Sequence, residues 1–112
     1  MSFTTAQLAC CVGGECYGDK TVECRGAEID TRRSVRGKVF FALKGTKSDG
    51  HKYLNEAVAG GCSALVVENK CLSEVPVVVV SDARKALFKL AEARRGVLPT
   101  KQVIAVTGSV GK

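Results

Sequence analysis

Residues 77–80 are four valines in succession, and this run restricts the fold more than any other feature of the chain. A short run of β-branched residues without polar alternation is typical of a strand that is covered on both faces of a sheet. Ser81 and Asp82 follow, and either side chain can cap a helix. The next residues predict an amphipathic helix with Gly96 as its terminator, because one side of it is apolar. That stripe consists of Ala83, Leu87, Leu90 and Ala91.

The same alternation of apolar strand and helix runs from residue 39 to residue 106. Apolar segments predict strands at 39–43, 64–67 and 103–106. Between the first two, helical spacing over residues 51–59 ends at two consecutive glycines, Gly60 and Gly61. Strands that alternate with helices indicate an α/β fold with an at least partly parallel sheet.

The first 38 residues carry weaker signals. Residues 4–12 predict a short helix that ends at Gly13, because glycine adopts the left-handed conformation of a helix end without steric cost. Within residues 15–26, Gly18 and Asp19 predict a turn and residues 21–24 a short strand, and residues 27–30 predict a second short strand. The expected architecture is a small α/β domain whose mixed, partly parallel sheet is flanked by helices.

Size and composition narrow the classes of protein. A chain of 112 residues forms one small domain, and 46% hydrophobic with 25% charged residues is typical of a soluble globular protein. The apolar runs are far shorter than a membrane helix, and the N-terminus lacks the pattern of a secretory signal. We therefore expect a cytoplasmic protein without membrane insertion, and reduced thiols for its six cysteines. Their irregular spacing and the single histidine, His51, do not favour a metal site.

Positive charge is concentrated between residues 30 and 52, where seven of the cations lie together with two acids. A clustered field steers an anionic ligand to one place better than a diffusely basic surface does. This segment therefore predicts an anion-binding loop region around the strand at 39–43. A solvated basic loop without a ligand is the alternative.

Residues 104–112 form an apolar strand that runs into a glycine-rich turn and ends in Gly-Lys. This is the pattern of a phosphate-binding P-loop, in which backbone N–H groups surround phosphate oxygens. The match is incomplete, since Val106 replaces the usual first glycine and no Ser or Thr follows Lys112. We expect an N-terminal piece of a longer enzyme that lacks catalysis by itself, with a chance loop as the alternative. The candidate ATP-binding residues are Thr107, Gly108, Ser109, Val110, Gly111 and Lys112.

Several blocks, in order and at matching spacing, resemble the Mur ligases, the ATP-dependent amide-bond-forming ligases of peptidoglycan precursor synthesis. The resemblance covers about residues 27–112. One departure is Arg-Gly-Lys at residues 36–38, where the family usually has Pro-Gly-Asp. The blocks are Asp-Thr-Arg at 30–32, Val-Phe-Phe-Ala-Leu-Lys-Gly at 39–45, Asp-Gly-His at 49–51, Glu-Ala-Val at 56–58 with Gly61 and Ala64, residues 79–82 with 86–91, and the P-loop at 107–112.

The resemblance implies a UDP-substrate-binding domain at residues 1–98. Residues 99–112 would then be the linker, first strand and P-loop of a truncated central ATP-binding domain. It also implies ATP and Mg²⁺ as cofactors of the full-length enzyme, none bound to this piece, and no catalytic residue within it. Thr31 would offer a hydroxyl near the uracil or ribose. The implied UDP-binding residues are Thr31, Arg32, Ala42, Lys44, Gly45, Asp49, Gly50 and His51.

Within the family, Gly-Ser-Val-Gly-Lys at 108–112 and Ala-Leu-Lys-Gly at 42–45 favour the member that joins D-alanyl-D-alanine to UDP-N-acetylmuramoyl-tripeptide. The alternative is the sister ligase that adds the third peptide residue to UDP-N-acetylmuramoyl-dipeptide. A basic nucleotide- or nucleic-acid-binding module is a further alternative, although few aromatic residues accompany the cations. A P-loop kinase or GTPase that begins at residue 103 would leave the preceding residues unexplained. We expect a monomer that binds no nucleic acid.

Overall fold

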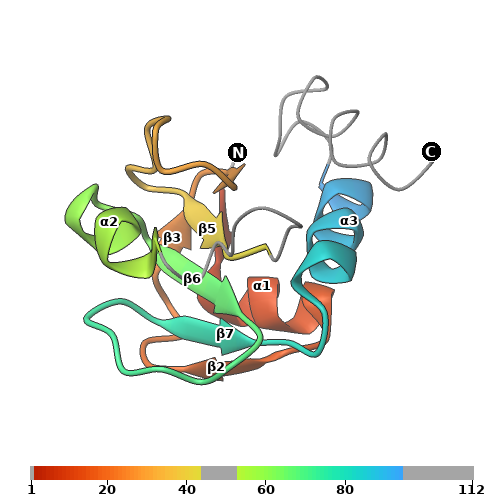
Figure 1. The fold of residues 1–112 in the computed structure, drawn as a ribbon. Helices are drawn as coiled ribbons and strands as arrows, with labels where there is room; N and C mark the ends of the chain where they lie inside the picture. The colour runs from red at the N-terminus through yellow and green to blue at the C-terminus, as the bar shows by residue number, and fades with distance from the viewer. Residues whose placement is uncertain (1, 44–52, 95–112) are drawn as a thin grey trace.

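A five-stranded mixed sheet organises the computed structural model, which describes residues 2–43 and 53–94. Its strand order is β2-β7-β6-β5-β4, in which four strands run parallel and β2 pairs antiparallel at the edge. This confirms the predicted α/β class with a mixed sheet (Figure 1). The strands are β2 (Glu15–Tyr17), β4 (Ala27–Glu28), β5 (Val39–Phe41), β6 (Ala64–Val67) and β7 (Val77–Val79).

The central strands are apolar throughout because both faces of the sheet are covered. All residues of β5 and β6 are buried, and their side chains alternate between two hydrophobic clusters. Phe41 packs in the cluster on one face and Phe40 in the cluster on the other. The valine run behaves in the same way, since Val78 faces the first cluster and Val77 the second.

Two helices and a small antiparallel ribbon cover the first face. Helices α1 (Thr5–Val12) and α3 (Ala83–Ala93) pack beside each other against the sheet (Figure 1), and β1 (Phe3–Thr4) pairs with β3 (Glu23–Cys24). In α3 the buried stripe is the predicted one, with Ala86 added and Ala91 only half-buried. Asp82 caps this helix by accepting a hydrogen bond from the Lys85 N–H at 3.1 Å.

Helix α1 has local signals at both ends. The Thr4 side chain accepts a hydrogen bond from the Gln7 N–H, and the Gln7 side chain accepts one from the Thr4 N–H, which together form a capping box. Gly13 ends the helix with φ of 70°, the left-handed conformation that glycine adopts without strain. The predicted helix is therefore confirmed, with Thr4 as its cap.

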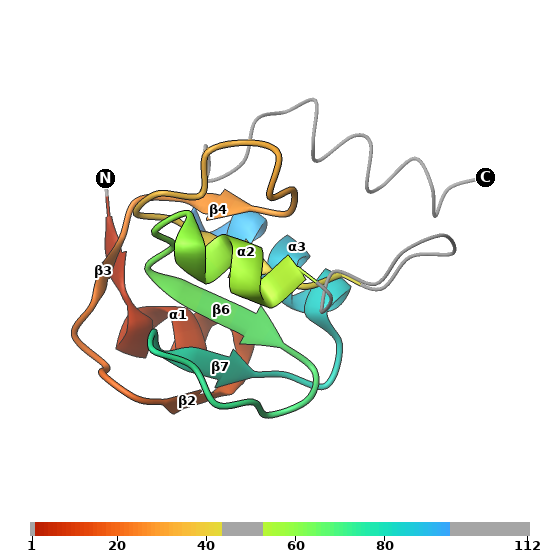
Figure 2. The same cartoon turned by 60° about the vertical axis from the view of Figure 1, so that its left-hand side comes forward.

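Helix α2 (Leu54–Ala59) and irregular connections cover the second face (Figure 2). Ala57 is fully buried, and Leu54 and Val58 pack beside it against the second cluster. Val35, from the connection between β4 and β5, completes this face. The short helix is therefore held by tertiary packing and not by its own length.

Some elements differ from the sequence-based expectation. Strand β5 ends at Phe41, two residues before the predicted end, and the strands β1 and β2 were not predicted. The predicted start of a helix at residue 51, the strand at 103–106 and the domain boundary at residue 98 lie outside the described residues. Among residues 2–43 and 53–94, no helix is long and apolar enough to cross a membrane.

Candidate functional site

The candidate site lies where β4 and β5 end. These strands are parallel neighbours, with Ala27 opposite Val39 and Glu28 opposite Phe40, so their carboxyl ends lie side by side. Ligands of open α/β sheets bind outside the carboxyl ends of the strands. Thr31 and Arg32 follow β4, and Ala42 follows β5, so the structure brings the described site candidates to one edge of the sheet.

The loop after β4 is held by a buried carboxylate. Glu28 is only 3% exposed, and its Oε2 atom accepts hydrogen bonds from the backbone N–H groups of Ile29 at 3.1 Å and Asp30 at 3.2 Å. Burial of a carboxylate costs a large free energy of desolvation unless hydrogen bonds within the protein replace those to water. Glu28 therefore fixes the direction in which the chain leaves the sheet.

Asp30 holds the next turn of this loop. Its Oδ1 atom accepts from the Arg32 N–H at 2.9 Å, and its Oδ2 atom forms an ion pair with Arg32 Nη2 at 2.9 Å. The hydrogen bonds from the Arg32 side chain and backbone lower the pKa of the Asp30 carboxyl. The Arg32 side chain is 89% exposed, so this pair orients the guanidinium and contributes little to stability.

Thr31 forms a hydrogen bond with helix α2. Its Oγ1 atom donates a hydrogen bond to Oε2 of Glu56 at 3.0 Å, although 25 residues separate the two in sequence. Thr31 is half-buried and Glu56 is exposed. The hydroxyl that we expected near a nucleoside is therefore ordered by a carboxylate from a different element.

Ala42 differs from the other candidates, because its side chain is fully buried in the second cluster. Its N–H donates to the Val66 carbonyl at 3.0 Å, which extends the pairing of β5 with β6. Its buried side chain therefore does not face a ligand. The candidates Lys44, Gly45, Asp49, Gly50 and His51, and all six candidate ATP-binding residues, lie outside the described residues.

The Arg-Gly-Lys segment at 36–38 forms a tight turn. The Lys38 N–H donates to the Val35 carbonyl at 2.9 Å, and Gly37 has φ of 71°. Positive φ at the third position alone is the requirement of a type II turn, in which proline is common at the second position. Arg36 occupies that second position, so the turn forms without a proline.

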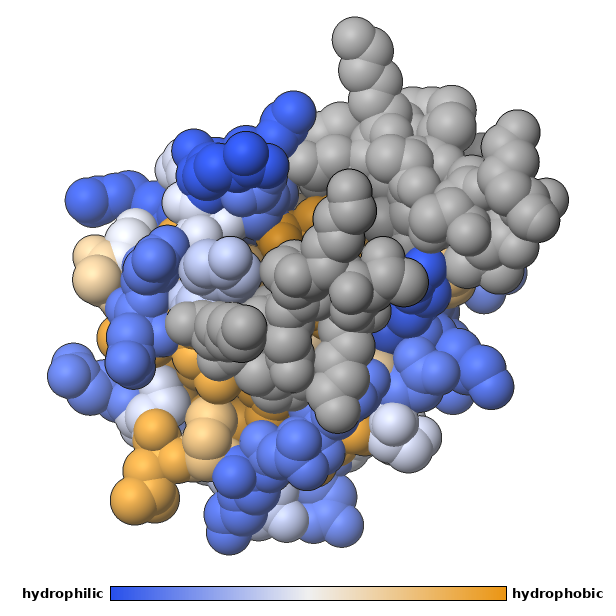
Figure 3. Space-filling view, viewed as in Figure 1, coloured by the Kyte–Doolittle hydropathy of each residue, from blue (hydrophilic) through white to orange (hydrophobic). Residues whose placement is uncertain are grey.

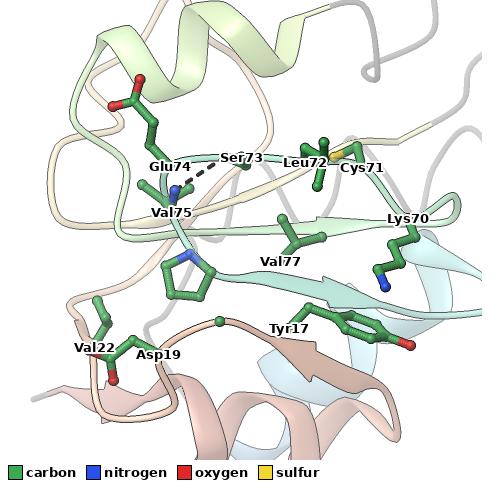
Figure 4. A pocket seen from close by; sticks show the side chains of 12 residues that line it. Tyr17, Asp19, Val22, Lys70, Cys71, Leu72, Ser73, Glu74, Val75 and Val77 are labelled. Atoms are coloured by element: carbon green, nitrogen blue, oxygen red, sulfur yellow. Dashed lines mark hydrogen bonds between the residues drawn. The ribbon is translucent and has the colours of Figure 1, made fainter.

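A groove of about 430 Å³ lies elsewhere, around the amino end of β7 (Figure 4). Tyr17, which pairs with Val77, forms one wall, and Lys70 lies over its ring at 4.1 Å from the centroid. The other wall is the connection between β6 and β7, in which Leu72 is 99% exposed. Figure 3 shows apolar surface at the lower left, where this connection lies in Figure 1. The groove is thus distinct from the candidate site at the carboxyl ends of β4 and β5, where Thr31 lies.

Glu28 and Glu56 are the residues that sequence reasoning missed. Glu56 belongs to a block that resembles the family, but no local pattern pairs it with Thr31. Glu28 shows a weak signal, since an acid in an otherwise apolar strand is buried only with partners. Among residues 2–43 and 53–94, no group of three or more His, Cys, Asp or Glu side chains is arranged to hold a metal ion. The candidate ATP-binding residues, 107–112, lie outside the described residues.

The fold defines the class of this chain as an α/β protein with a mixed sheet between two layers. Within this class, the sequence model described as "Mur ligase family, catalytic domain" matches residues 23–110. The chain belongs to the Mur ligase family.

Curated relatives of two kinds match. The chain is 44% identical over its whole length to the UDP-N-acetylmuramoyl-tripeptide–D-alanyl-D-alanine ligase of Haemophilus influenzae and 38% identical to that of Escherichia coli. It covers 24% of each of these two proteins. The UDP-N-acetylmuramoyl-L-alanyl-D-glutamate–2,6-diaminopimelate ligase of Geobacillus kaustophilus is 48% identical over 76% of the chain, which covers 18% of that protein. The chain therefore spans about a quarter or less of the length of these relatives.

Solved structures share the fold. A crystal structure of MurF from Acinetobacter baumannii matches 81% of the chain with a TM-score of 0.73 and 32% identity, over 20% of its own length. MurF ligase from Thermotoga maritima, solved in complex with ADP, matches 62% of the chain with a TM-score of 0.57 and 30% identity, over 16% of its own length. Both likenesses confirm the α/β architecture predicted from the sequence.

Proposed function

We propose that this chain is part of a ligase that joins D-alanyl-D-alanine to UDP-N-acetylmuramoyl-tripeptide with ATP. In this proposal the edge formed by β4 and β5 binds the uridine diphosphate part of the substrate. The observation that carries the choice of ligase is the extent of the match. Both D-alanyl-D-alanine ligases align with 100% of the chain, including its first 22 residues, which the family model does not cover.

The ligase that adds diaminopimelate is the second candidate. Its support is the 48% identity of the Geobacillus kaustophilus relative, a higher value than for either D-alanyl-D-alanine ligase, although over 76% of the chain. Related first domains that bind the same UDP sugar would be expected to share residues at the site and to differ elsewhere. The extra aligned length therefore favours the D-alanyl-D-alanine ligase.

The chemistry of the edge supports uridine diphosphate as the ligand. Thr31 offers a hydroxyl and Arg32 an exposed guanidinium on one loop, which Glu28 and Asp30 hold by hydrogen bonds. The guanidinium of arginine can bind two phosphate oxygens at once through two parallel hydrogen bonds. A hydroxyl and a cation at neighbouring positions match a nucleoside joined to a diphosphate. Residues 107–112 would hold ATP, and Mg²⁺ would neutralise charge on its phosphates.

Binding to this chain tests the site. Isothermal titration with UDP and with UDP-N-acetylmuramoyl-tripeptide should show binding that Thr31→Ala weakens about tenfold, the size expected for one lost hydrogen bond. Added salt should weaken binding further, because the guanidinium attracts a charged diphosphate. Thr21→Ala is the matched control, since Thr21 bonds to Asp19 in a different part of the molecule. No binding at millimolar concentrations of either ligand would overturn the site.

Activity of the whole ligase tests the choice between relatives. The protein encoded by the complete gene should release phosphate from ATP when given UDP-N-acetylmuramoyl-tripeptide and D-alanyl-D-alanine together. Release with UDP-N-acetylmuramoyl-dipeptide and diaminopimelate instead would favour the second candidate. Omission of either acceptor from its pair provides the background rate.

A further inference from the structure

The hydrogen bond between Thr31 and Glu56 determines what Thr31 can offer to a ligand. A carboxylate has acceptor atoms only, so across the 3.0 Å contact the hydroxyl must be the donor. The single proton of the hydroxyl is then committed to Glu56. Two lone pairs on Oγ1 remain, and they can only accept.

Both partners are held in place by their own elements. Residue 31 lies between Asp30, whose N–H donates to Glu28, and Arg32, whose N–H donates to Asp30. The Arg33 N–H donates to the Asp30 carbonyl at 3.1 Å and closes the turn around Thr31. Glu56 belongs to α2, which the buried Ala57 seats on the sheet. The fold thus holds the backbone of both partners in place, and the hydrogen bond directs the hydroxyl proton toward Glu56.

The charges around Thr31 favour a neutral group as its ligand. The Glu56 carboxylate contacts the hydroxyl directly, whereas the carboxylate of the preceding residue, Asp30, is paired with Arg32. A phosphate at Thr31 would lie beside the Glu56 carboxylate and would be repelled. The nucleoside end of a nucleotide is neutral and carries hydrogen-bond donors.

We propose that Glu56 makes Thr31 an obligate acceptor, and that Thr31 thereby selects nucleotides with a donor at this position. This inference depends on the proposed function, because it concerns the same site. Two donors of a uridine nucleotide fit, the N3–H of uracil and a ribose hydroxyl. Cytosine has an acceptor at N3, so a contact with the base discriminates against cytidine, whereas a contact with ribose discriminates against dideoxyribose. Glu56 is a positioning residue, since it acts through Thr31.

Ratios of affinities test this inference. Isothermal titration of the chain with UDP, CDP and 2′,3′-dideoxy-UDP should show a preference of about tenfold for UDP over one of the two analogues. Weaker binding of CDP than of UDP identifies the base as the donor to Thr31. Weaker binding of the dideoxy analogue than of UDP identifies a ribose hydroxyl as the donor. Glu56→Ala frees the hydroxyl to rotate and should reduce this preference at least threefold. Glu56→Lys places a donor beside Thr31 and should remove the preference completely.

All three ligands carry the same diphosphate, so a change in the net charge of the protein alters their affinities equally. The ratios of these affinities therefore report the specific effect of Glu56. Glu92→Ala removes an exposed acid from α3 and should leave every ratio unchanged. In Thr31→Ala the preference should be absent, and adding Glu56→Ala to that variant should change nothing. Far-UV circular dichroism verifies that each variant is folded.

The outcomes are distinct. If UDP does not bind at millimolar concentrations, the proposed function fails and this inference fails with it. A second outcome is that UDP binds but binds no more tightly than either analogue, or that Glu56→Ala keeps the full preference for UDP. In that case Glu56 does not make the Thr31 hydroxyl an acceptor. The inference alone is then overturned.

Discussion

The carboxylate of Glu68 accepts a hydrogen bond from the backbone N–H of Ala83 at 3.0 Å. Glu68 follows the carboxyl end of β6, and Ala83 is the first residue of α3. The first N–H groups of a helix have no partner within the helix, and the N-terminus carries partial positive charge. A carboxylate from a neighbouring strand therefore supplements the local cap provided by Asp82.

Removal of this second cap should destabilise the protein. In Glu68→Ala the Ala83 N–H loses its acceptor, and we expect the free energy of unfolding to fall by about 1 kcal/mol. Urea unfolding followed by circular dichroism measures the change. Glu92→Ala, which removes an exposed acid from the other end of the same helix, should have an effect within about 0.5 kcal/mol. Equal stability of Glu68→Ala and the unaltered protein would show that Asp82 caps α3 by itself.

Two leucines with opposite exposure offer a matched comparison. Leu87 is fully buried between α3 and the sheet, whereas Leu72 is 99% exposed on the connection before β7. Leu87→Ala should cost about 2–5 kcal/mol because it leaves a cavity, and Leu72→Ala should change stability by less than about 0.5 kcal/mol. Chemical denaturation of both variants measures the difference. Similar losses in the two variants would contradict the packing of α3.

The six thiols should differ in reactivity. All six are free, and Cys10 is exposed whereas Cys24 and Cys62 are buried. Burial raises the pKa of Cys24 to about 12, with smaller contributions from the neighbouring Cys62 and Cys16 thiols, and it raises the pKa of Cys62 to about 11. The thiolate is the reactive form, so iodoacetamide at pH 8 should modify Cys10 first and the two buried thiols only after unfolding. Peptide mass spectrometry before and after urea treatment identifies the modified residues.

The same two pKa values predict how stability changes with pH. In the unfolded chain these thiols ionise near pH 9, whereas in the folded chain they stay protonated until about pH 11–12. Between these values the folded state binds more protons, so stability is fully present below pH 9 and falls as the pH rises toward 12. A Cys24→Ala variant should show a shallower fall over this window. An equally steep fall would assign the effect to other groups.

The turn at residues 35–38 predicts a stabilising substitution. Arg36 occupies the second position of a type II turn, and no hydrogen bond from its N–H is present among the described residues. Arg36→Pro should raise the free energy of unfolding by about 0.4–1 kcal/mol, because it restricts the unfolded chain. Lys38→Pro is the control and should destabilise, since the Lys38 N–H donates to Val35. Thermal unfolding of both variants compares them, and a lower midpoint for Arg36→Pro would contradict the assigned turn.

Local patterns were sufficient to predict the helices α1 and α3 and the buried strands. Thr4 and Asp82 cap their helices through hydrogen bonds that span three residues, and the stripe that includes Leu87 and Leu90 follows the helical period. The valine run identified β7 because a strand covered on both faces needs no polar alternation. The position of Thr31 after β4 was likewise evident from the order of the segments.

Only the tertiary structure decided which distant segments meet. Strand β2 is only three residues long, too short for its alternating burial to stand out in the sequence, and it becomes a strand by pairing with β7, 60 to 64 residues later. The hydrogen bond from Thr31 to Glu56 likewise joins residues that no local pattern connects. Such pairings depend on the packing of the whole core. Bringing distant segments together costs chain entropy, and contacts throughout the fold, not the local sequence, compensate for it. The sequence by itself therefore determined the elements and the candidate loops, and the packing of the sheet decided the partners of the side chains in them.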